Sequence, residues 1–443
     1  MNVSQISIVG AGIGGLSAAL ALQHFGYRVR VFEQARELRE VGAGVVISPN
    51  AMHALNFLGI GERVAKEAGP AEAFVSRHFQ TGEVLKIRPG NDYVERFGAA
   101  YHQVHRVDLQ AALASAVGQN DPDCVFLDHC FEALTQGSKG LAAKFTNGNT
   151  FTSDVLIGCD GGASKVRACV FGDEVVNYTG QVAFRALVPM ANVPATIQQH
   201  PFAMFVGINR YLLHYPLRHR TIMNVIAVGR EPSWQQEGWR IPATVEEFAN
   251  LYSDVYPPAL QLIRAISPGT LFKWGLRDRE PLPQYTAGRV TMLGDAAHPM
   301  MPFLGQGACI AIEDAMVLGR AFAAANTYQE AFVLYESTRK ERANGVQLAS
   351  RRQADEIQGV TARGPNPGTD SENRGLYSYN PVVVPLTRAG ETRSIQYAPE
   401  APEKSPLGHS RRFGDLRRMS DLHPASDVSG PGRDFAVGPV PDI

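Results

Sequence analysis

The chain has 443 residues, of which 44% are hydrophobic, and its 42 basic and 43 acidic residues leave a formal net charge of −1. A chain of this length can bury the cores of two domains, since a domain usually holds about 100–200 residues. The balance of charge argues against a broad basic surface for nucleic acid or anionic lipid, so we expect a small-molecule partner.

The cysteines and the apolar runs bear on the compartment. The five cysteines are scattered, odd in number and never spaced as C-x-x-C, which argues against a disulfide framework or a zinc site. A predicted buried strand begins by Ile6, which leaves no room for a cleavable signal, and no apolar run approaches the length of a membrane span. We therefore expect a cytoplasmic protein without a metal site, and we leave monomer and homodimer open.

The first predicted unit is a strand, a glycine-rich loop, a helix and a second strand, from Ile6 to about Glu33. The apolar strand runs directly into a loop with G-x-G-x-x-G spacing. Gly10 allows the tight turn, Gly12 lets the backbone approach a pyrophosphate, and Gly15 lets the helix pack on the sheet. The N-terminus of the helix presents N–H groups and the positive end of its dipole to the phosphates.

Two further residues complete this pattern. Gly26 is expected to end the helix, and the strand Arg28–Phe32 leads to Glu33, whose carboxylate can accept both ribose hydroxyls of an adenosine. An unrelated turn in a doubly wound sheet would not need all of these features in one register. The unit therefore predicts a site for the adenosine-diphosphate half of a dinucleotide. Glu33 disfavours NADP, whereas NAD and FAD both remain open.

The chain then continues in the same style to about residue 180 before its pattern changes. Helices are predicted at Asn50 to about Ala68 and at Leu109–Val117, and short strands end at Leu156–Cys159. Between about 181 and 273 the pattern is that of an antiparallel sheet, with a helix near Val245–Tyr252. The strands predicted there are Phe202–Val206, Tyr211–Tyr215 and Ile222–Val228.

After this insertion the first style returns, with a strand at Val290–Leu293 and a long helix from about Ala308 to Ala325. We expect an α/β fold in which a Rossmann-type nucleotide-binding domain (1–180 and 274–355, with long helices) carries an antiparallel-sheet substrate domain (181–273). Residues 356–443 are a C-terminal extension. It is rich in Pro, Gly, Ser and Arg with few aromatics, which predicts disorder from about residue 387.

A second group of motifs, more than 250 residues after the first, favours FAD over NAD. Asp295 follows Gly294 at the end of a predicted strand, where its carboxylate can bind a polyol hydroxyl. The turn Gly305–Gly307 opens a helix whose N-terminus can face the N1–C2=O edge of a flavin, where reduced flavin carries negative charge. A nicotinamide enzyme needs neither feature, so FAD is the predicted dinucleotide.

At these residues the chain resembles the single-component FAD-dependent aromatic hydroxylases, which include salicylate, 3-hydroxybenzoate and 6-hydroxynicotinate hydroxylases. The resemblance covers roughly residues 4–385. It rests on four motifs in the family's order, which are the glycine fingerprint with Glu33, HRVDL from His105, DGGASKVR from Asp160 and GDAAHP from Gly294.

The resemblance assigns roles to cofactor-binding residues by position. It implies that Arg106 lies along the FAD phosphates and ribityl chain, and that Asp295 binds the ribityl group. Backbone N–H groups of Gly307 and Ala308 would bind the flavin ring. Asp160 would serve the dinucleotide site and its communication with reduced pyridine nucleotide, and Gly44 ends the loop 41–44, along which the flavin ring swings in the family.

The resemblance also implies the reaction. NADH or NADPH would reduce FAD, O2 would add to give a flavin C4a-hydroperoxide, and an OH group would pass to a small aromatic substrate. We find no second strand-G-x-G-x-x-G-helix unit, which favours transient docking of the nicotinamide. Such a reaction needs a dry pocket and a means of deprotonating or polarising a phenol. Both are expected from the inserted sheet.

Three residues of that sheet are the candidate catalytic residues. Alternation along the strand places Tyr211 and Tyr215 on one face and His214 on the other, so His214 is expected to be structural. Close relatives commonly carry a histidine at the position of Tyr211, so the general base is left open. Arg185 matches a family arginine at the pocket edge that holds an anionic substrate or supports phenolate formation.

Two apolar positions bear on the substrate, and other flavoprotein functions remain as alternatives to a hydroxylase. Several relatives place polar side chains near Val46 and Phe303, which are apolar here, and this favours a carbocyclic phenol over 6-hydroxynicotinate. A flavin reductase or dehydrogenase on the same fold, and a flavin-binding regulator without turnover, both remain open. A flavin halogenase is disfavoured because Gly238–Pro242 lacks the tandem tryptophans that such enzymes need.

Overall fold

The computed structural model describes residues 3–38, 43–70, 73–172, 175–234, 236, 238, 240–357 and 375–388, and the statements below concern these residues. All of them belong to one unit, Met1–Pro399. The described residues end at 388, so the disorder predicted from about residue 387 falls almost wholly outside them. Within the loop 41–44, residues 41 and 42 also lie outside them.

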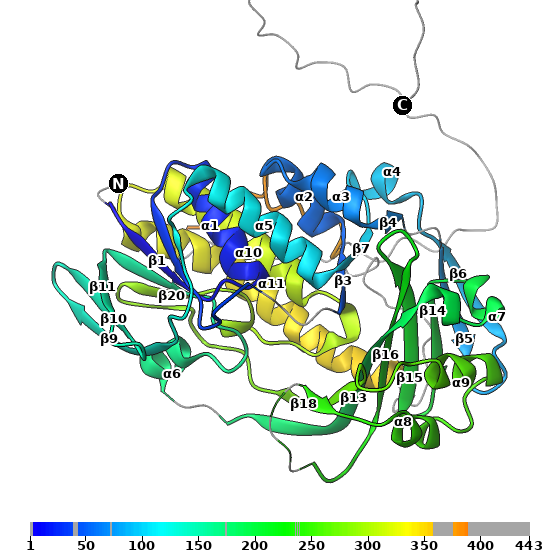
Figure 1. Ribbon diagram of the computed structural model, residues 1–443. Coiled ribbons are helices and arrows are strands. Elements are labelled where there is room, and N and C mark those ends of the chain that lie inside the picture. Colours follow the sequence, from blue (N-terminus) through cyan, green and yellow to red (C-terminus); the bar gives the residue numbers. More distant parts are fainter. Residues whose placement is uncertain are drawn as a thin grey trace, which may run out of the picture. The chain divides into compact units, whose positions relative to one another are not determined.

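A six-stranded sheet has the order β19-β20-β12-β1-β2-β8, and Figure 1 labels its strands β1 and β20. We call it the nucleotide-binding layer because the motifs predicted to bind a nucleotide follow its strands. All of its pairs are parallel except β19 with β20. Because parallel strands end at the same edge, the motifs that follow β1, β2, β12 and β20 meet there. Its strands are β1 (Ile6–Val9), β2 (Val29–Phe32), β8 (Val125–Phe126), β12 (Val155–Gly158), β19 (Thr286–Ala287) and β20 (Val290–Met292).

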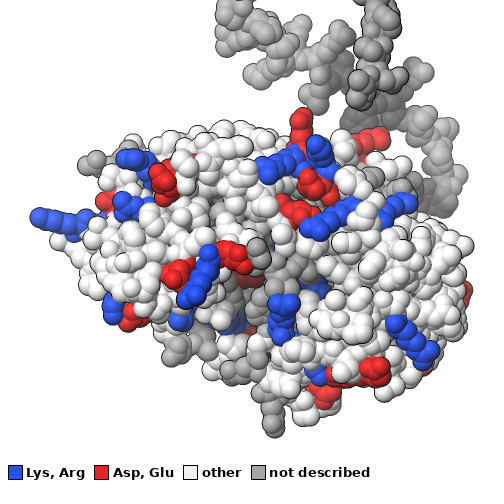
Figure 2. Space-filling view, viewed as in Figure 1, with Lys and Arg blue, Asp and Glu red and all other residues white. Residues whose placement is uncertain are grey.

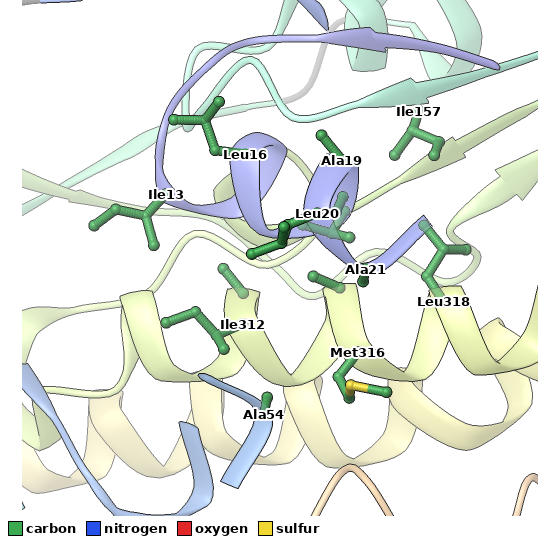
Figure 3. Close-up of a cluster of buried hydrophobic side chains, with 14 of the residues drawn as sticks. Ile13, Leu16, Ala19, Leu20, Ala21, Ala54, Ile157, Ile312, Met316 and Leu318 are labelled. Atoms are coloured by element: carbon green, nitrogen blue, oxygen red, sulfur yellow. The ribbon is translucent and has the colours of Figure 1, made fainter. Parts of the chain in front are cut away.

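Two long buried helices cross each other beside this sheet. In the cluster of Figure 3, Leu20 of α1 (Ile13–His24) lies over Ile312 and Met316 of α10 (Gly307–Ala324). The helices approach closely at Gly319, where a Cβ atom would lie 3.1 Å from Cβ of Ala21. The packing fixes the start of α10 relative to the helix that follows the glycine loop.

The predicted helix from Asn50 to Ala68 is wrong as a single element, because the chain turns at Gly59 with φ +78° and forms two helices. A positive φ leaves the right-handed helical region, and glycine adopts it without strain. The other predicted helices and strands are confirmed within a few residues. The remaining helices are α2 (Pro49–Phe57), α3 (Gly61–Glu67), α4 (Tyr93–Phe97), α5 (Arg106–Asn120), α6 (Lys165–Phe171), α7 (Ala195–Gln198), α8 (Val245–Leu251), α9 (Pro257–Arg264) and α11 (Tyr328–Ile357).

An eight-stranded sheet forms the second layer, in the order β17-β18-β13-β16-β15-β14-β5-β6. Its pairs are antiparallel except β14 with β5. Strands β5 and β6 belong to this sheet although they lie before residue 181, where the predicted substrate domain begins. The bounds of the predicted domains stay a prediction. The strands are β5 (Ala73–His78), β6 (Val84–Pro89), β13 (Asn177–Pro189), β14 (Ala203–Gly207), β15 (Arg210–Leu217), β16 (Ile222–Arg230), β17 (Ile241–Pro242) and β18 (Phe272–Asp278).

The two faces of this sheet have different neighbours. One face packs on α8 and α9, where Phe184 of β13 stacks on Phe248 with ring centroids 4.8 Å apart. On the other face Tyr211 clusters with Met301 and Phe303, which belong to the segment before α10. This second face therefore meets the nucleotide-binding layer.

Smaller sheets complete the fold. One has the order β3-β7-β4, and the other is the meander β11-β10-β9. Their strands are β3 (Gly44–Ile47), β4 (Gly69–Pro70), β7 (His102–His105), β9 (Phe131–Gly137), β10 (Gly140–Phe145) and β11 (Thr150–Ser153). Short 3₁₀ turns lie at Met190–Asn192, Gly294–Ala296 and Pro302–Leu304.

The surface shows no single-sign field on the face drawn in Figure 2, where basic and acidic side chains are interspersed. This agrees with the formal net charge of −1. Among the described helices, none is long and apolar enough to cross a membrane.

Candidate functional site

The glycine loop is too crowded for side chains. Gly10 has φ +104°, and a Cβ atom there would lie 2.4 Å from the carbonyl oxygen of Cys159. A Cβ atom at Gly15 would lie 1.9 Å from the carbonyl oxygen of Gly10. Helix α1 begins after Gly12 without a side-chain cap, so its first N–H groups can bind a phosphate. The loop fits the diphosphate of a dinucleotide.

Glu33 is fixed at the end of β2 by backbone N–H groups. Its carboxylate accepts hydrogen bonds from the N–H of Ala11 at 2.8 Å and of Ala35 at 2.9 Å. The side chain of Gln110, on α5, donates to the carbonyl oxygen of Ala11 at 2.9 Å. Gln110 therefore supports the glycine loop from a third element, a role that the sequence analysis missed.

Asp160 organises the loop that follows β12. Its carboxylate accepts from the hydroxyl of Ser164 and, at 3.0 Å, from the N–H of Val166 at the start of α6. The guanidinium of Arg167 then donates to the carbonyl oxygens of Gly162 and Ala296, both at 2.8 Å. This motif is thus tied to the turn that carries Asp295.

Asp295 lies exposed in the 3₁₀ turn Gly294–Ala296, beside the start of α10. A Cβ atom at Gly307 would lie 3.9 Å from Oδ1 of Asp295. Gly307 and Ala308 form the first turn of α10, which has no side-chain cap. The structure therefore brings together the acidic residue and the helix N-terminus that the sequence analysis assigned to one flavin site.

Gly44 connects the small sheet β3-β7-β4 to the eight-stranded sheet. Its carbonyl oxygen accepts from the guanidinium of Arg185 at 2.8 Å, and its N–H donates to Oδ1 of Asn224 at 3.1 Å. A Cβ atom at Gly44 would lie 2.5 Å from the ring of Tyr215, so only glycine fits. The adjacent Ala43 accepts from the N–H of Arg106 at 2.9 Å. Three strands of the eight-stranded sheet, β13, β15 and β16, thus hold one residue of the small sheet β3-β7-β4.

Tyr215, which is buried, and Arg185, which is half-buried, form a polar pair. Arg185 hydrogen-bonds to Tyr215 and contacts no carboxylate within the described part of the chain, and its Nε is buried without a partner. Burial lowers the pKa of Arg185 and raises the pKa of Tyr215 to about 12, although Arg185 opposes the latter shift. At neutral pH the pair therefore combines a positive charge with a protonated hydroxyl.

The rest of this sheet face is apolar. Tyr211 lies against Phe303 with ring centroids 5.7 Å apart, and burial raises its pKa. The strand registers place a set of half-buried residues on the same face as Arg185, and their remaining accessible surface shows that solvent-sized space adjoins them. They are Leu187, Met204, Leu213, Ile226 and Trp274.

His214 lies on the opposite face, as the alternation predicts. Its Nδ1 is 3.1 Å from the carbonyl oxygen of Pro201, its ring lies near Phe205, and its Nε2 is buried without a partner among the described residues. Burial lowers its pKa to about 4. The position fits a structural histidine on the α8–α9 side of the sheet.

His214 predicts a loss of stability in acid. Between pH 6.5 and pH 4 the unfolded chain binds a proton at this residue that the folded chain does not bind, so the free energy of unfolding falls as pH falls through this window. The loss is about 2 kcal/mol between pH 6.5 and pH 5. Urea unfolding should show this extra loss in the wild type but not in His214→Gln, which stays neutral and can still donate to Pro201. Equal losses in both proteins would contradict the prediction.

Asn224 was also missed by the sequence analysis. It lies opposite Tyr215 in the β15–β16 register and is buried. The signal was a single polar residue inside the apolar run of the strand Ile222–Val228, since a buried amide needs hydrogen-bond partners. The partner, Gly44, lies 180 residues earlier in the chain, and no local pattern identifies it.

Comparisons with known proteins agree with this geometry. A family model described as an FAD binding domain matches residues 3–352. The 3-hydroxybenzoate 6-hydroxylase of Polaromonas naphthalenivorans (strain CJ2) is 37% identical over 350 residues, which cover 78% of this chain and 86% of the relative. The 6-hydroxynicotinate 3-monooxygenase of Pseudomonas fluorescens is 36% identical over 355 residues, or 78% and 90% of the two chains.

A solved structure is similar over most of its length. HpxO of Klebsiella pneumoniae, complexed with FAD and uric acid, superposes with a TM-score of 0.74 at 28% identity. The match covers 81% of this chain and 90% of that chain.

Proposed function

The chain belongs to the family of FAD-dependent aromatic hydroxylases, and from this premise we propose that its substrate is a small carbocyclic phenol with an anionic group, such as a hydroxybenzoate. The observation that carries the proposal is Arg185, which is half-buried with its Nε enclosed and unpartnered, hydrogen-bonds to Tyr215 and contacts no carboxylate within the described residues. A partly desolvated charge without a counter-ion is unfavourable, and a carboxylate or phenolate would compensate it.

FAD is the cofactor, and NADH or NADPH is the typical electron donor of the family. When bound and reduced, FAD activates O2 and thereby supplies the oxygen atom. The fit is supported by the glycine cradle, by the uncapped helix α1 and by the position of Asp295 beside α10. The residues proposed to hold FAD are Gly10, Gly12, Gly15, Glu33, Gly44, Arg106, Asp160, Asp295, Gly307 and Ala308.

The chain's own residues then act on the substrate. Arg185 binds its anionic oxygen, and the Tyr215 hydroxyl donates a hydrogen bond to the phenolic oxygen. Burial raises the pKa of Tyr215 to about 12, so its hydroxyl stays protonated at neutral pH and can donate this hydrogen bond. The positive charge of Arg185 favours the electron-rich phenolate form of the bound substrate.

The surrounding side chains exclude water from the reaction. Tyr211 and the half-buried apolar residues Leu187, Met204, Leu213, Ile226 and Trp274 line the same face as Arg185. In such surroundings the reactive oxygen is protected from loss as H2O2, and the hydrogen bonds of Arg185 and Tyr215 are stronger than in water.

A panel of aromatic compounds tests this proposal. Hydroxybenzoates should stimulate NAD(P)H oxidation by at least about tenfold and give hydroxylated products, because they supply both the anion and the phenol. Matched compounds that lack either the carboxylate or the hydroxyl group are the controls, and they should stimulate less. If no phenol or aromatic acid in the panel stimulates NAD(P)H oxidation, the substrate class is wrong. NAD(P)H consumption without a hydroxylated product would instead favour a flavin reductase.

A further inference from the structure

Helix α10 carries two adjacent carboxylates, Glu313 and Asp314, whose side chains are 0% exposed. Arg339 of α11 contacts both, with Nε 2.7 Å from Oδ1 of Asp314 and NH1 2.7 Å from Oε2 of Glu313. Arg342 adds a second guanidinium, 2.8 Å from Glu313. Burying these charges costs free energy of desolvation, which their ion pairs and hydrogen bonds offset.

Asp314 reaches back to the turn that carries Asp295. Its Oδ2 is 2.5 Å from Nε2 of His298 and accepts from the N–H of Gly294 at 3.3 Å. Gly294 has φ +62°, and its carbonyl oxygen accepts from the N–H of His298 at 2.9 Å. One carboxylate oxygen therefore holds the two ends of the turn on either side of Asp295.

Glu313 is linked through Asn50 to Gln306, in the turn Gly305–Gly307 at the start of α10. The side-chain amide of Asn50 donates to Oε1 of Glu313 at 2.6 Å and lies 3.0 Å from Oε1 of Gln306. Gln306 is the residue before the first turn of α10. Two neighbouring carboxylates, joined by Arg339, thus anchor the two segments that flank the proposed flavin site.

We propose that Asp314 is a positioning residue for FAD, because it holds the Gly294–Ala296 turn in the conformation that presents the Asp295 carboxylate to the ribityl chain. This inference rests on the proposed role of Asp295. Asp314 itself is buried behind the turn and acts only through it. In Asp314→Asn the remaining oxygen is expected to face the charged guanidinium of Arg339, which is the stronger donor, so the NH2 group faces Gly294 and His298 and their acceptor is lost.

A double-mutant cycle on FAD binding to the full-length apoprotein tests the inference. Quenching of flavin fluorescence gives the Kd for the wild type, Asp314→Asn, Asp295→Ala and the double variant. We expect Asp314→Asn alone to weaken binding at least about tenfold, but to weaken it less than about twofold when Asp295 is already alanine, because residues that act together are not additive. Effects that multiply, or an Asp314→Asn Kd within about twofold of the wild type, would overturn it.

Two further variants decide the matter if Asp314→Asn does not fold. His298→Leu removes the donor to Asp314, whereas His298→Gln keeps an N–H donor near the same position. We expect the leucine variant to weaken FAD binding and to alter the visible circular dichroism of the bound flavin, and the glutamine variant to restore both. Equal behaviour of the two variants would contradict the inference.

Arg351→Gln is the control variant, and Asp295→Ala shows whether a negative result concerns Asp295 or only Asp314. Arg351→Gln breaks the ion pairs of α11 with Asp278 and Glu280, and it should leave the FAD Kd unchanged. If Asp295→Ala leaves the Kd unchanged, the proposed role of Asp295 fails and the inference fails with it. If Asp295→Ala weakens binding and Asp314→Asn does not, only the inference fails.

Discussion

Asp295→Ala is expected to weaken FAD binding by about 10- to 100-fold, because hydrogen bonds to a charged group contribute about 1.5–3 kcal/mol. Its carboxylate is exposed beside the start of α10, where the polyol chain of FAD would pass. The purified variant should therefore be pale, with the absorbance of bound flavin near 450 nm restored only by added FAD. The ratio of flavin to protein absorbance after gel filtration measures the effect.

A matched control separates this loss from a general effect of removing a carboxylate. Asp123 is exposed in the turn before β8, at the edge of the parallel sheet opposite to the glycine loop. Asp123→Ala should keep its full complement of FAD. An Asp295→Ala protein that stays as yellow as this control would remove Asp295 from the site.

Arg185→Ala and Tyr215→Phe are expected to keep FAD but to lose hydroxylation by on the order of 100-fold, because each removes a polar group that we propose to act on the substrate. Arg185→Ala leaves Tyr215 without its hydrogen-bond partner and frees the carbonyl oxygen of Gly44. Tyr215→Phe keeps the stacking on Phe202, whose ring centroid lies 5.5 Å away, and removes only the hydroxyl. Both variants should divert O2 to H2O2.

The measurement is the ratio of hydroxylated product to NAD(P)H consumed, with H2O2 determined in parallel. Tyr178→Phe is the control, because Tyr178 lies on the same strand as Arg185 but bonds to the carbonyl oxygen of Glu231 at the far end. It should remain fully coupled. Full coupling in Arg185→Ala or in Tyr215→Phe would exclude that residue from the substrate site.

The nucleotide-binding layer could be predicted because its signals are local. The glycine loop, the stop at Gly26 and the acidic residue after β2 all lie within one short stretch of sequence. Gly26 has φ +85° and follows the end of α1, as the sequence indicates. Parallel strands ending at one edge then explain why motifs far apart in the chain converge.

Several contacts between segments far apart in the chain could not be predicted, because no local pattern in the sequence records them. Asn224 binds Gly44, and β5 pairs with β14, across long separations that no periodicity records. Asp314 was visible in the sequence as a charge on a helix, but its partner Arg339 lies 25 residues later on α11. The break of the predicted helix at Gly59 had a local signal, a glycine near its middle, that the apolar periodicity obscured.

The central prediction is that one oxygen atom of O2 is transferred to the aromatic substrate, and isotope labelling of O2 tests it most directly. The enzyme is supplied with FAD, NAD(P)H, a hydroxybenzoate that stimulates NAD(P)H oxidation, and ¹⁸O2. We predict one labelled oxygen atom in each molecule of product and one product for each NAD(P)H consumed. Product without the label, or NAD(P)H oxidation that yields only H2O2 with every compound tested, would contradict the account.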